Sequence, residues 1–244
     1  NNYSKFKDKI IYLVIENEPK GIEFSENNKL TSALKRMNSI KRIEQSYDYM
    51  MNGIKEALDD DLIIISDNDE IPNLNSNTFK KSRKNIFIFK QFFFFYKFNL
   101  LYDRMFWYGT KACKKKKLKS FSWLRNLKNK KYPFWRLDCF FSSTKEFNID
   151  IIEDGGWHFT NLKSPENLFQ KFLNYGHHNE FEDKGFTLKD IKDQISRKIV
   201  NYDHFADKNK TDKNKFEYKL KKVDNKILPD YLQKNQNFYK EWFD

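Results

Sequence analysis

The chain has 244 residues, of which 39% are hydrophobic and 33% are charged, and its formal net charge is +12. This length supports an α/β domain with a substantial core, and the scarcity of glycine (7) and proline (5) argues against collagen-like, linker-rich and many-turned all-β architectures. The positive charge favours a phosphorylated or polyanionic partner, or an anionic membrane surface.

Cysteine content and hydropathy bear on the compartment. Cys113 and Cys139 match no metal motif and give no disulfide framework, so we expect free thiols in a reducing compartment. No apolar run approaches the roughly 20 residues of a membrane span. We therefore expect a cytoplasmic protein of a microbe or virus, with peripheral contact to an anionic membrane as one option. The Golgi lumen is the alternative if a targeting segment preceded Asn1.

Two short apolar runs, residues 9–15 and 62–65, are rich in β-branched side chains and predict strands. Between them, apolar side chains spaced three and four apart over residues 38–58 predict one face of a long amphipathic helix. Strand–helix–strand order is typical of a parallel α/β sheet. The sequence therefore predicts an α/β fold with a mostly parallel central sheet flanked by helices.

The strand at residues 62–65 ends in a polar cluster, Asp67, Asn68, Asp69 and Glu70. In open α/β sheets ligands bind just beyond the carboxyl ends of strands. Asp67 and Asp69 could share a divalent cation, and their oxygen ligands suit Mg²⁺ or Mn²⁺. A purely structural role for the pair, as a turn or helix cap, is the common alternative.

An aromatic run follows at residues 86–98 and predicts a strand buried on both faces, or one strand running into another. Trp107 could stack on a ligand or fill the core. Residues 114–117 are four consecutive lysines, which predict a solvated loop or a site that attracts phosphate or anionic lipid.

A second cluster of candidate functional residues follows an expected strand at residues 149–152. It reads Glu153-Asp154-Gly155-Gly156-Trp157-His158. The two glycines allow a ligand or a second backbone to approach closely. A lone histidine is more often structural than a ligand.

Capping residues predict two later helices. Ser164 and Pro165 are typical of a helix start, and Thr187 with Asp190 forms a weak capping box. Residues 207–226 are rich in Lys, Asp and Asn, and a last helix is expected within residues 228–242. We therefore expect one domain over residues 1–205, with a charged connection and a C-terminal helix that packs on it over residues 206–244.

Two of these motifs resemble, in the same order, segments of glycosyltransferase family 17, which includes the enzyme that adds the bisecting N-acetylglucosamine to N-glycans. Residues 66–72, Ser-Asp-Asn-Asp-Glu-Ile-Pro, are similar to its Asp-x-Asp-Glu-Ile-Pro segment, and residues 155–159 to its Gly-Trp-His-Phe motif. Two motifs at compatible spacing are more specific than either alone. The resemblance spans roughly residues 9–180, and the family's first strand has no counterpart.

The resemblance implies a GT-A-like single domain and an inverting, metal-dependent glycosyltransferase. It would move a sugar, most simply N-acetylglucosamine from UDP-N-acetylglucosamine, onto a glycan or polysaccharide acceptor. Asp154, or else Glu153, would take the proton of the acceptor hydroxyl. The other implied roles are Mn²⁺ or Mg²⁺ ligands at Asp67, Asp69 and His158, with His178 as the competing histidine; donor contacts at Asn68, Glu70 and Lys163; and acceptor contacts at Trp157 and Trp107.

Two other classes stay open. A metal-dependent nucleotidyltransferase or phosphohydrolase could use Asp67 and Asp69, but would usually need further carboxylates for a second metal. A basic nucleic-acid-binding domain would account for the charge. However, the chain has no zinc-finger spacing and no RNA-recognition aromatic motif, so we expect no nucleic-acid partner.

Overall fold

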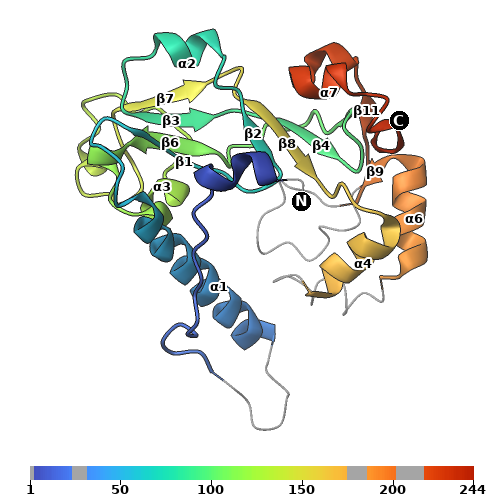
Figure 1. Cartoon of the computed structure of the whole chain (residues 1–244), viewed down its shortest axis with the longest axis horizontal. Helices are drawn as coiled ribbons and strands as arrows, with labels where there is room; N and C mark the ends of the chain where they lie inside the picture. Colours follow the sequence, from blue (N-terminus) through green and yellow to red (C-terminus); the bar gives the residue numbers. More distant parts are fainter. Residues whose placement is uncertain (1–2, 24–31, 175–185, 202–216) are drawn as a thin grey trace. The chain divides into compact units, whose positions relative to one another are not determined.

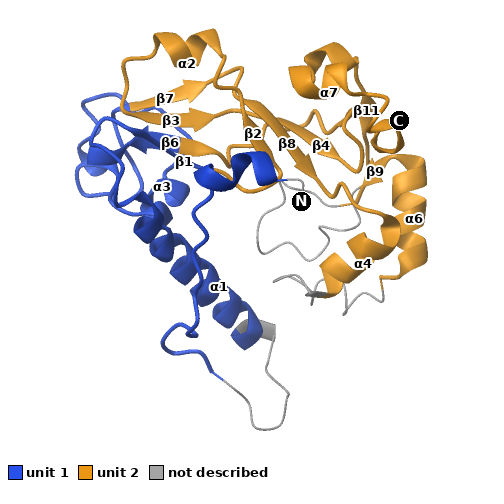
Figure 2. Cartoon of the chain, in the orientation of Figure 1, with its two compact units in different colours: residues 1–65, 112–148 blue, residues 66–111, 149–244 orange. Residues whose placement is uncertain are grey.

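The structure is a computed structural model that describes residues 3–23, 32–174, 186–201 and 217–244. The chain forms two compact units (Figure 2). Unit 1 comprises residues 1–65 and 112–148, and unit 2 comprises residues 66–111 and 149–244.

Unit 1 contains a long helix and short strands. Its elements are η1 (Ser4–Lys9), α1 (Ser32–Tyr49), η2 (Met50–Ile54), β1 (Leu62–Ile65), β6 (Lys111–Lys114, whose first residue belongs to unit 2), η3 (Lys115–Lys117), α3 (Phe121–Asn126) and η4 (Leu137–Cys139). The helix expected at 38–58 is confirmed up to Tyr49, where it tightens into η2. The strand at 62–65 is confirmed as β1, a neighbour of β6 in its sheet.

The strand predicted at residues 9–15 is wrong. Residues 10–15 form no regular element, and the side chains of Ile11 and Tyr12 are exposed. A β-branched run becomes a strand only where a partner strand pairs with it and a packed face covers it. The predicted free thiols are confirmed, since Cys113 and Cys139 are both unpaired and buried.

Unit 2 contains most of the sheet structure (Figure 1). β3 (Ile86–Phe89) pairs in parallel with β7 (Ile149–Ile152). A five-stranded sheet has the order β11 (Lys221–Lys222), β5 (Leu100–Leu101), β4 (Phe92–Phe95), β8 (Gly156–Thr160), β2 (Glu70–Pro72). Its β4–β8 pair is parallel, and its other three pairs are antiparallel. β9 (Ile199–Val200) and β10 (Tyr218–Lys219) form a separate antiparallel pair.

The α/β class and the flanking helices are thus confirmed, but the mostly parallel sheet is wrong because the sheets are mixed. Short connections explain the difference. Parallel neighbours need a crossover of about a dozen residues or more. The chain instead reverses at once between β4 and β5, and it turns tightly before β2, where Glu70 N donates to Asp67 O at 3.0 Å.

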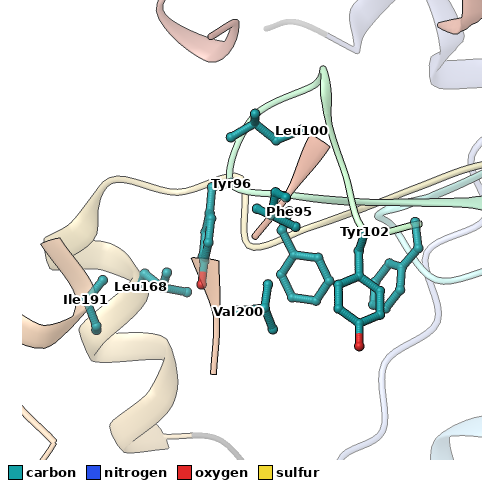
Figure 3. Packing of buried hydrophobic residues seen from close by; sticks show 9 residues of the cluster. Phe95, Tyr96, Leu100, Tyr102, Leu168, Ile191 and Val200 are labelled. Atoms are coloured by element: carbon teal, nitrogen blue, oxygen red, sulfur yellow. The ribbon is translucent and has the colours of Figure 1, made fainter. Parts of the chain in front are cut away.

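The aromatic run at 86–98 forms two strands, β3 and β4, which confirms the prediction of one strand running into another. Both strands are largely buried. Phe93 and Phe95 project to one face of the sheet, which α4 (Pro165–Asn174) and α6 (Leu188–Arg197) cover (Figure 3). Phe94 projects to the other face and packs with Phe159 and the C-terminal segment.

The C-terminal segment forms η5 (Asn225–Ile227), α7 (Asp230–Lys234) and η6 (Lys240–Trp242) rather than one continuous helix. Leu228 and Leu232 are its buried anchors. Both predicted helix starts are confirmed, because α4 begins at Pro165 and Thr187 forms a capping box with Asp190. The remaining helix of unit 2 is α2 (Asn77–Lys81). No helix in the described part of the chain has both the length and the hydropathy of a transmembrane segment.

Candidate functional site

Pairing of β2 with β8 brings together the two motifs that the sequence singles out. Glu70 lies opposite His158 and Pro72 lies opposite Gly156 in the antiparallel ladder. Phe159 N donates to Asp69 O at 2.8 Å, which extends the ladder by one residue. Side chains alternate between the faces of a strand, so Glu70 and His158 project to the same face of the sheet.

The two glycines before Trp157 serve backbone packing. A Cβ at Gly156, whose φ is +114°, would lie 2.1 Å from the carbonyl oxygen of Ile71. A Cβ at Gly155 would lie 2.4 Å from the backbone nitrogen of Lys90. The sequence left open whether a ligand or a second backbone approaches these glycines. In the structure, it is a second backbone.

His158 packs against two aromatic rings that also contact each other, with 5.3 Å between the ring centroids of Phe93 and Trp107. Its ring centroid lies 4.8 Å from that of Phe93 and 4.5 Å from that of Trp107, and both pairs are stacked. Its side chain is buried, and Nδ1 has no hydrogen-bond partner among the described residues. Nε2 lies 3.4 Å from Oδ2 of Asp69. The two stacked rings therefore restrict the orientation of the imidazole, while its Nε2 faces a carboxylate.

Asp69 is surrounded by groups that favour its charged form. Partial burial acts to raise the pKa of its carboxyl group, but the hydrogen bond and charge of His158, with the charge of Lys171, lower it below its usual range. Lys171 itself is half-buried on α4 and donates to Asn161 Oδ1 at 2.9 Å. Burial and repulsion from Lys163 hold the pKa of Lys171 below its usual value, despite attraction to Asp69. A carboxylate, an imidazole and two lysines thus interact at one place.

Glu70 is a buried carboxylate with three internal donors. It accepts from Trp107 Nε1 at 2.6 Å, from Thr110 Oγ1 at 2.9 Å and from the backbone nitrogen of Asp67 at 3.1 Å. Gly109 leaves room for it, because a Cβ there would lie 1.6 Å from Oε1. Glu70 therefore stabilises the turn after β1, in contrast to the direct donor contact expected from the sequence.

Several residues around this turn were missed by the sequence analysis. The hydroxyl groups of Ser66 and Thr110 lie 2.8 Å apart, and Gln91 Nε2 donates to Thr110 Oγ1 at 3.2 Å. Thr110 lies three residues after Trp107, which the sequence had already singled out as a candidate ligand contact. Lys171 sits on an amphipathic helix in no motif, and nothing in the sequence marked it.

Both tryptophans assigned to the acceptor are engaged in packing. Trp107 stacks on His158 and donates to Glu70. Trp157 projects to the opposite face of the sheet, where its Nε1 donates to Ile227 O at 2.6 Å. Asp67, Asn68 and Lys163 are exposed.

The two candidates for the catalytic base lie elsewhere on the ladder. Asp154 accepts a hydrogen bond from the Ser76 hydroxyl, and Glu153 forms an ion pair with Lys90 at 2.6 Å. Asp154 lies in the turn before β8, and β8 then runs three residues from Gly156 to Phe159, roughly 10 Å at about 3.3 Å per residue. The structure therefore does not bring Asp154 and Glu153 to the Asp69–His158 pair. His178 lies outside the described residues.

The geometry of Asp69 and His158 is compatible with a shared divalent cation. Two ligands about 2.1 Å from one ion lie about 3.0 Å apart at a right angle and about 3.4 Å apart at the tetrahedral angle. No group of three or more His, Cys, Asp or Glu side chains among the described residues could hold a metal. Such an ion would therefore complete its coordination with water and phosphate oxygens, as Mg²⁺ commonly does.

No protein-family model, curated protein or solved structure matches this chain.

Proposed function

We propose that this chain is a metal-dependent glycosyltransferase whose nucleotide-diphosphate sugar binds beside Asp69 and His158. The observation that carries the proposal is the 3.4 Å approach of these two side chains. They come from the two motifs that resemble family 17, and the β2–β8 register aligns those motifs. A chance resemblance in either motif alone would not explain why the side chains of Asp69 and His158 lie next to each other.

The surrounding residues fit a diphosphate. Lys171 and Lys163 supply positive charge next to the carboxylate, and a half-buried lysine whose pKa is shifted by burial and by charged neighbours is typical of a functional site. A bound Mn²⁺ or Mg²⁺ would neutralise charge that builds up on the diphosphate leaving group. Asp69 and His158 would hold that ion, and the Phe93 and Trp107 rings would keep the imidazole in one orientation.

The alternatives have less support from these residues. Two-metal phosphoryl chemistry needs more carboxylates around the ion than the described residues supply. A nucleic-acid surface would place phosphates against the carboxylates of residues 67–70, which repel them. We assign the catalytic base to neither Asp154 nor Glu153, since Ser76 and Lys90 hold them away from Asp69.

Calorimetry with UDP tests the proposal. Wild-type protein should bind UDP in the presence of Mn²⁺ and much more weakly in the presence of a chelator. A donor screen for metal-dependent hydrolysis of nucleotide sugars should then show turnover of at least one UDP-sugar. Metal-independent binding of oligonucleotides that weakens with salt, with no UDP binding, would replace the proposal by the nucleic-acid alternative.

A further inference from the structure

A second feature of the molecule, wholly within unit 1, is a group of large apolar side chains exposed on one loop. Phe141 is 92% exposed and Phe134 is 81% exposed. We call the group the aromatic patch; it consists of Phe134, Trp135, Leu137, Phe140 and Phe141, each more than two-thirds exposed. Single exposed apolar residues are normal in soluble proteins, but five within the eight residues 134–141 are typical of an interaction surface.

The loop that carries the aromatic patch is held in a defined conformation. Lys128 N donates to Thr144 O at 2.8 Å and closes the base of the loop. Within it, Asp138 accepts from Arg136 Nε at 2.7 Å and forms an ion pair with Lys145 at 2.5 Å. Cys139 is buried between exposed neighbours and anchors the centre of the loop. The apolar side chains are therefore presented by a fixed backbone.

The same loop is strongly cationic. Residues 128–145 contain five cationic side chains and one carboxylate, that of Asp138. Lys128, Lys130 and Lys131 are exposed and directly precede the patch. Exposed aromatic and leucine side chains next to lysines match the boundary between lipid headgroups and acyl chains, where rings sit at headgroup depth and cations meet phosphates.

We propose that the aromatic patch and its three lysines bind the surface of an anionic lipid bilayer. Charge decides between this partner and a second copy of the chain. A two-fold symmetric contact through the patch would place the same cluster of cations from both copies against itself. An anionic bilayer accepts both the rings and the cations, and it requires no membrane-spanning helix. This inference does not depend on the proposed glycosyltransferase function.

Vesicle sedimentation of the full chain tests the inference. Wild-type protein should sediment with vesicles of phosphatidylcholine and phosphatidylglycerol, and at least about tenfold more weakly with phosphatidylcholine alone. Raising the salt concentration should weaken the anionic binding, because salt screens exposed charges. Lys130→Gln combined with Lys131→Gln should reduce anionic binding by about fivefold or more.

A matched pair of variants isolates the patch. Phe134 and Phe238 are 81% and 80% exposed, and each makes an edge contact with one neighbouring aromatic ring. Phe134→Ser should weaken vesicle binding several-fold and Phe238→Ser should not, and the double variant Trp135→Ser, Phe141→Ser should abolish it. Circular dichroism should show all variants folded, since the substituted side chains lie in solvent.

Three outcomes would overturn the inference. The first is equal vesicle binding by wild type and the Trp135→Ser, Phe141→Ser variant. The second is equal binding to neutral and anionic vesicles. The third is self-association in analytical ultracentrifugation that the double variant loses, without lipid binding, which would assign the patch to a second copy of the chain.

Discussion

The imidazole Nε2 of His158 lies 3.4 Å from the Asp69 carboxylate, in a pair whose members come from distant parts of the sequence. Neither motif produces this contact alone. It follows from the register of β2 on β8, which sets Glu70 opposite His158, and from the tight turn that puts Asp69 immediately before β2. The function proposed for this site therefore depends on what holds that turn and on what the Asp69–His158 pair binds.

Glu70→Gln should destabilise the protein strongly. One carboxylate oxygen accepts from Trp107 and the other from Thr110 and Asp67 N, so either orientation of the amide puts its NH₂ against a donor. Leaving such buried groups unsatisfied costs about 2–3 kcal/mol of unfolding free energy, measured by urea denaturation. Glu153→Gln is the control, because its exposed ion pair with Lys90 contributes roughly 0.5 kcal/mol or less. Equal effects of the two variants would refute the structural role of Glu70.

Gly109→Ala should be among the most damaging single substitutions in unit 2. Its Cβ would lie 1.6 Å from Glu70 Oε1 and 2.2 Å from Trp107 Nε1, so the network must break or the backbone must move. We expect a loss of about 3 kcal/mol or more in denaturation experiments. Gly53→Ala provides the comparison, since its Cβ meets only the flexible Leu13 side chain at 3.2 Å. The prediction fails if Gly109→Ala melts within a few degrees of Gly53→Ala.

Lys171→Met should raise stability and weaken UDP binding. The folded protein holds the pKa of Lys171 below its ordinary value of 10.5, mainly through burial. The charged form therefore costs folding free energy at neutral pH. This cost disappears as the pH rises from the folded pKa toward 10.5, so wild type and variant should converge in melting temperature in alkaline solution. UDP affinity should fall about tenfold, as expected for a lost charge-assisted hydrogen bond.

Lys234→Met controls for the loss of one positive charge, because Lys234 is exposed on α7. It should change neither the melting temperature nor the UDP affinity appreciably. Unchanged UDP affinity in Lys171→Met would remove Lys171 from the proposed site.

Asp154→Asn separates the base expected from the sequence from the role that its contacts indicate. Asn can still accept the Ser76 hydroxyl, so we expect stability within about 0.5 kcal/mol and Mn²⁺–UDP binding like wild type. Turnover should stay within a few-fold, because Asp154 lies at the other end of the ladder from Asp69. A loss of turnover of about 100-fold with unchanged binding would instead identify Asp154 as the general base.

The sequence predicted local structure well where the pattern of a single segment, or one capping residue, determines the element. β1, the two aromatic strands and the starts of α4 and α6 all follow from hydrophobic pattern or capping chemistry. The run at 9–15 has the composition of a strand, but it pairs with no strand among the described residues, and a local pattern does not show which strands pair. β2 was missed because it is a three-residue edge strand that ends at Pro72.

The candidate site was predictable only in part. The sequence marked Asp69 by its place just beyond a strand and His158 through the family resemblance, and the contact between them depends on long-range register. Glu70 was expected to face a ligand, but its three donors arrive from the turn and from residues 107–110. Lys171 acts on Asp69 only because α4 packs on that face of the sheet, which no local pattern could report.

Binding of Mn²⁺ in the presence of UDP, measured by calorimetry and by electron paramagnetic resonance, tests the central claim most directly. Asp69→Asn and His158→Ala should each weaken Mn²⁺ binding by at least about tenfold, the usual effect of losing a ligand or its support. Asp59→Asn, which changes an exposed carboxylate of unit 1, should bind like wild type. Wild-type Mn²⁺ affinity in both Asp69→Asn and His158→Ala, with the fold intact, would contradict the account.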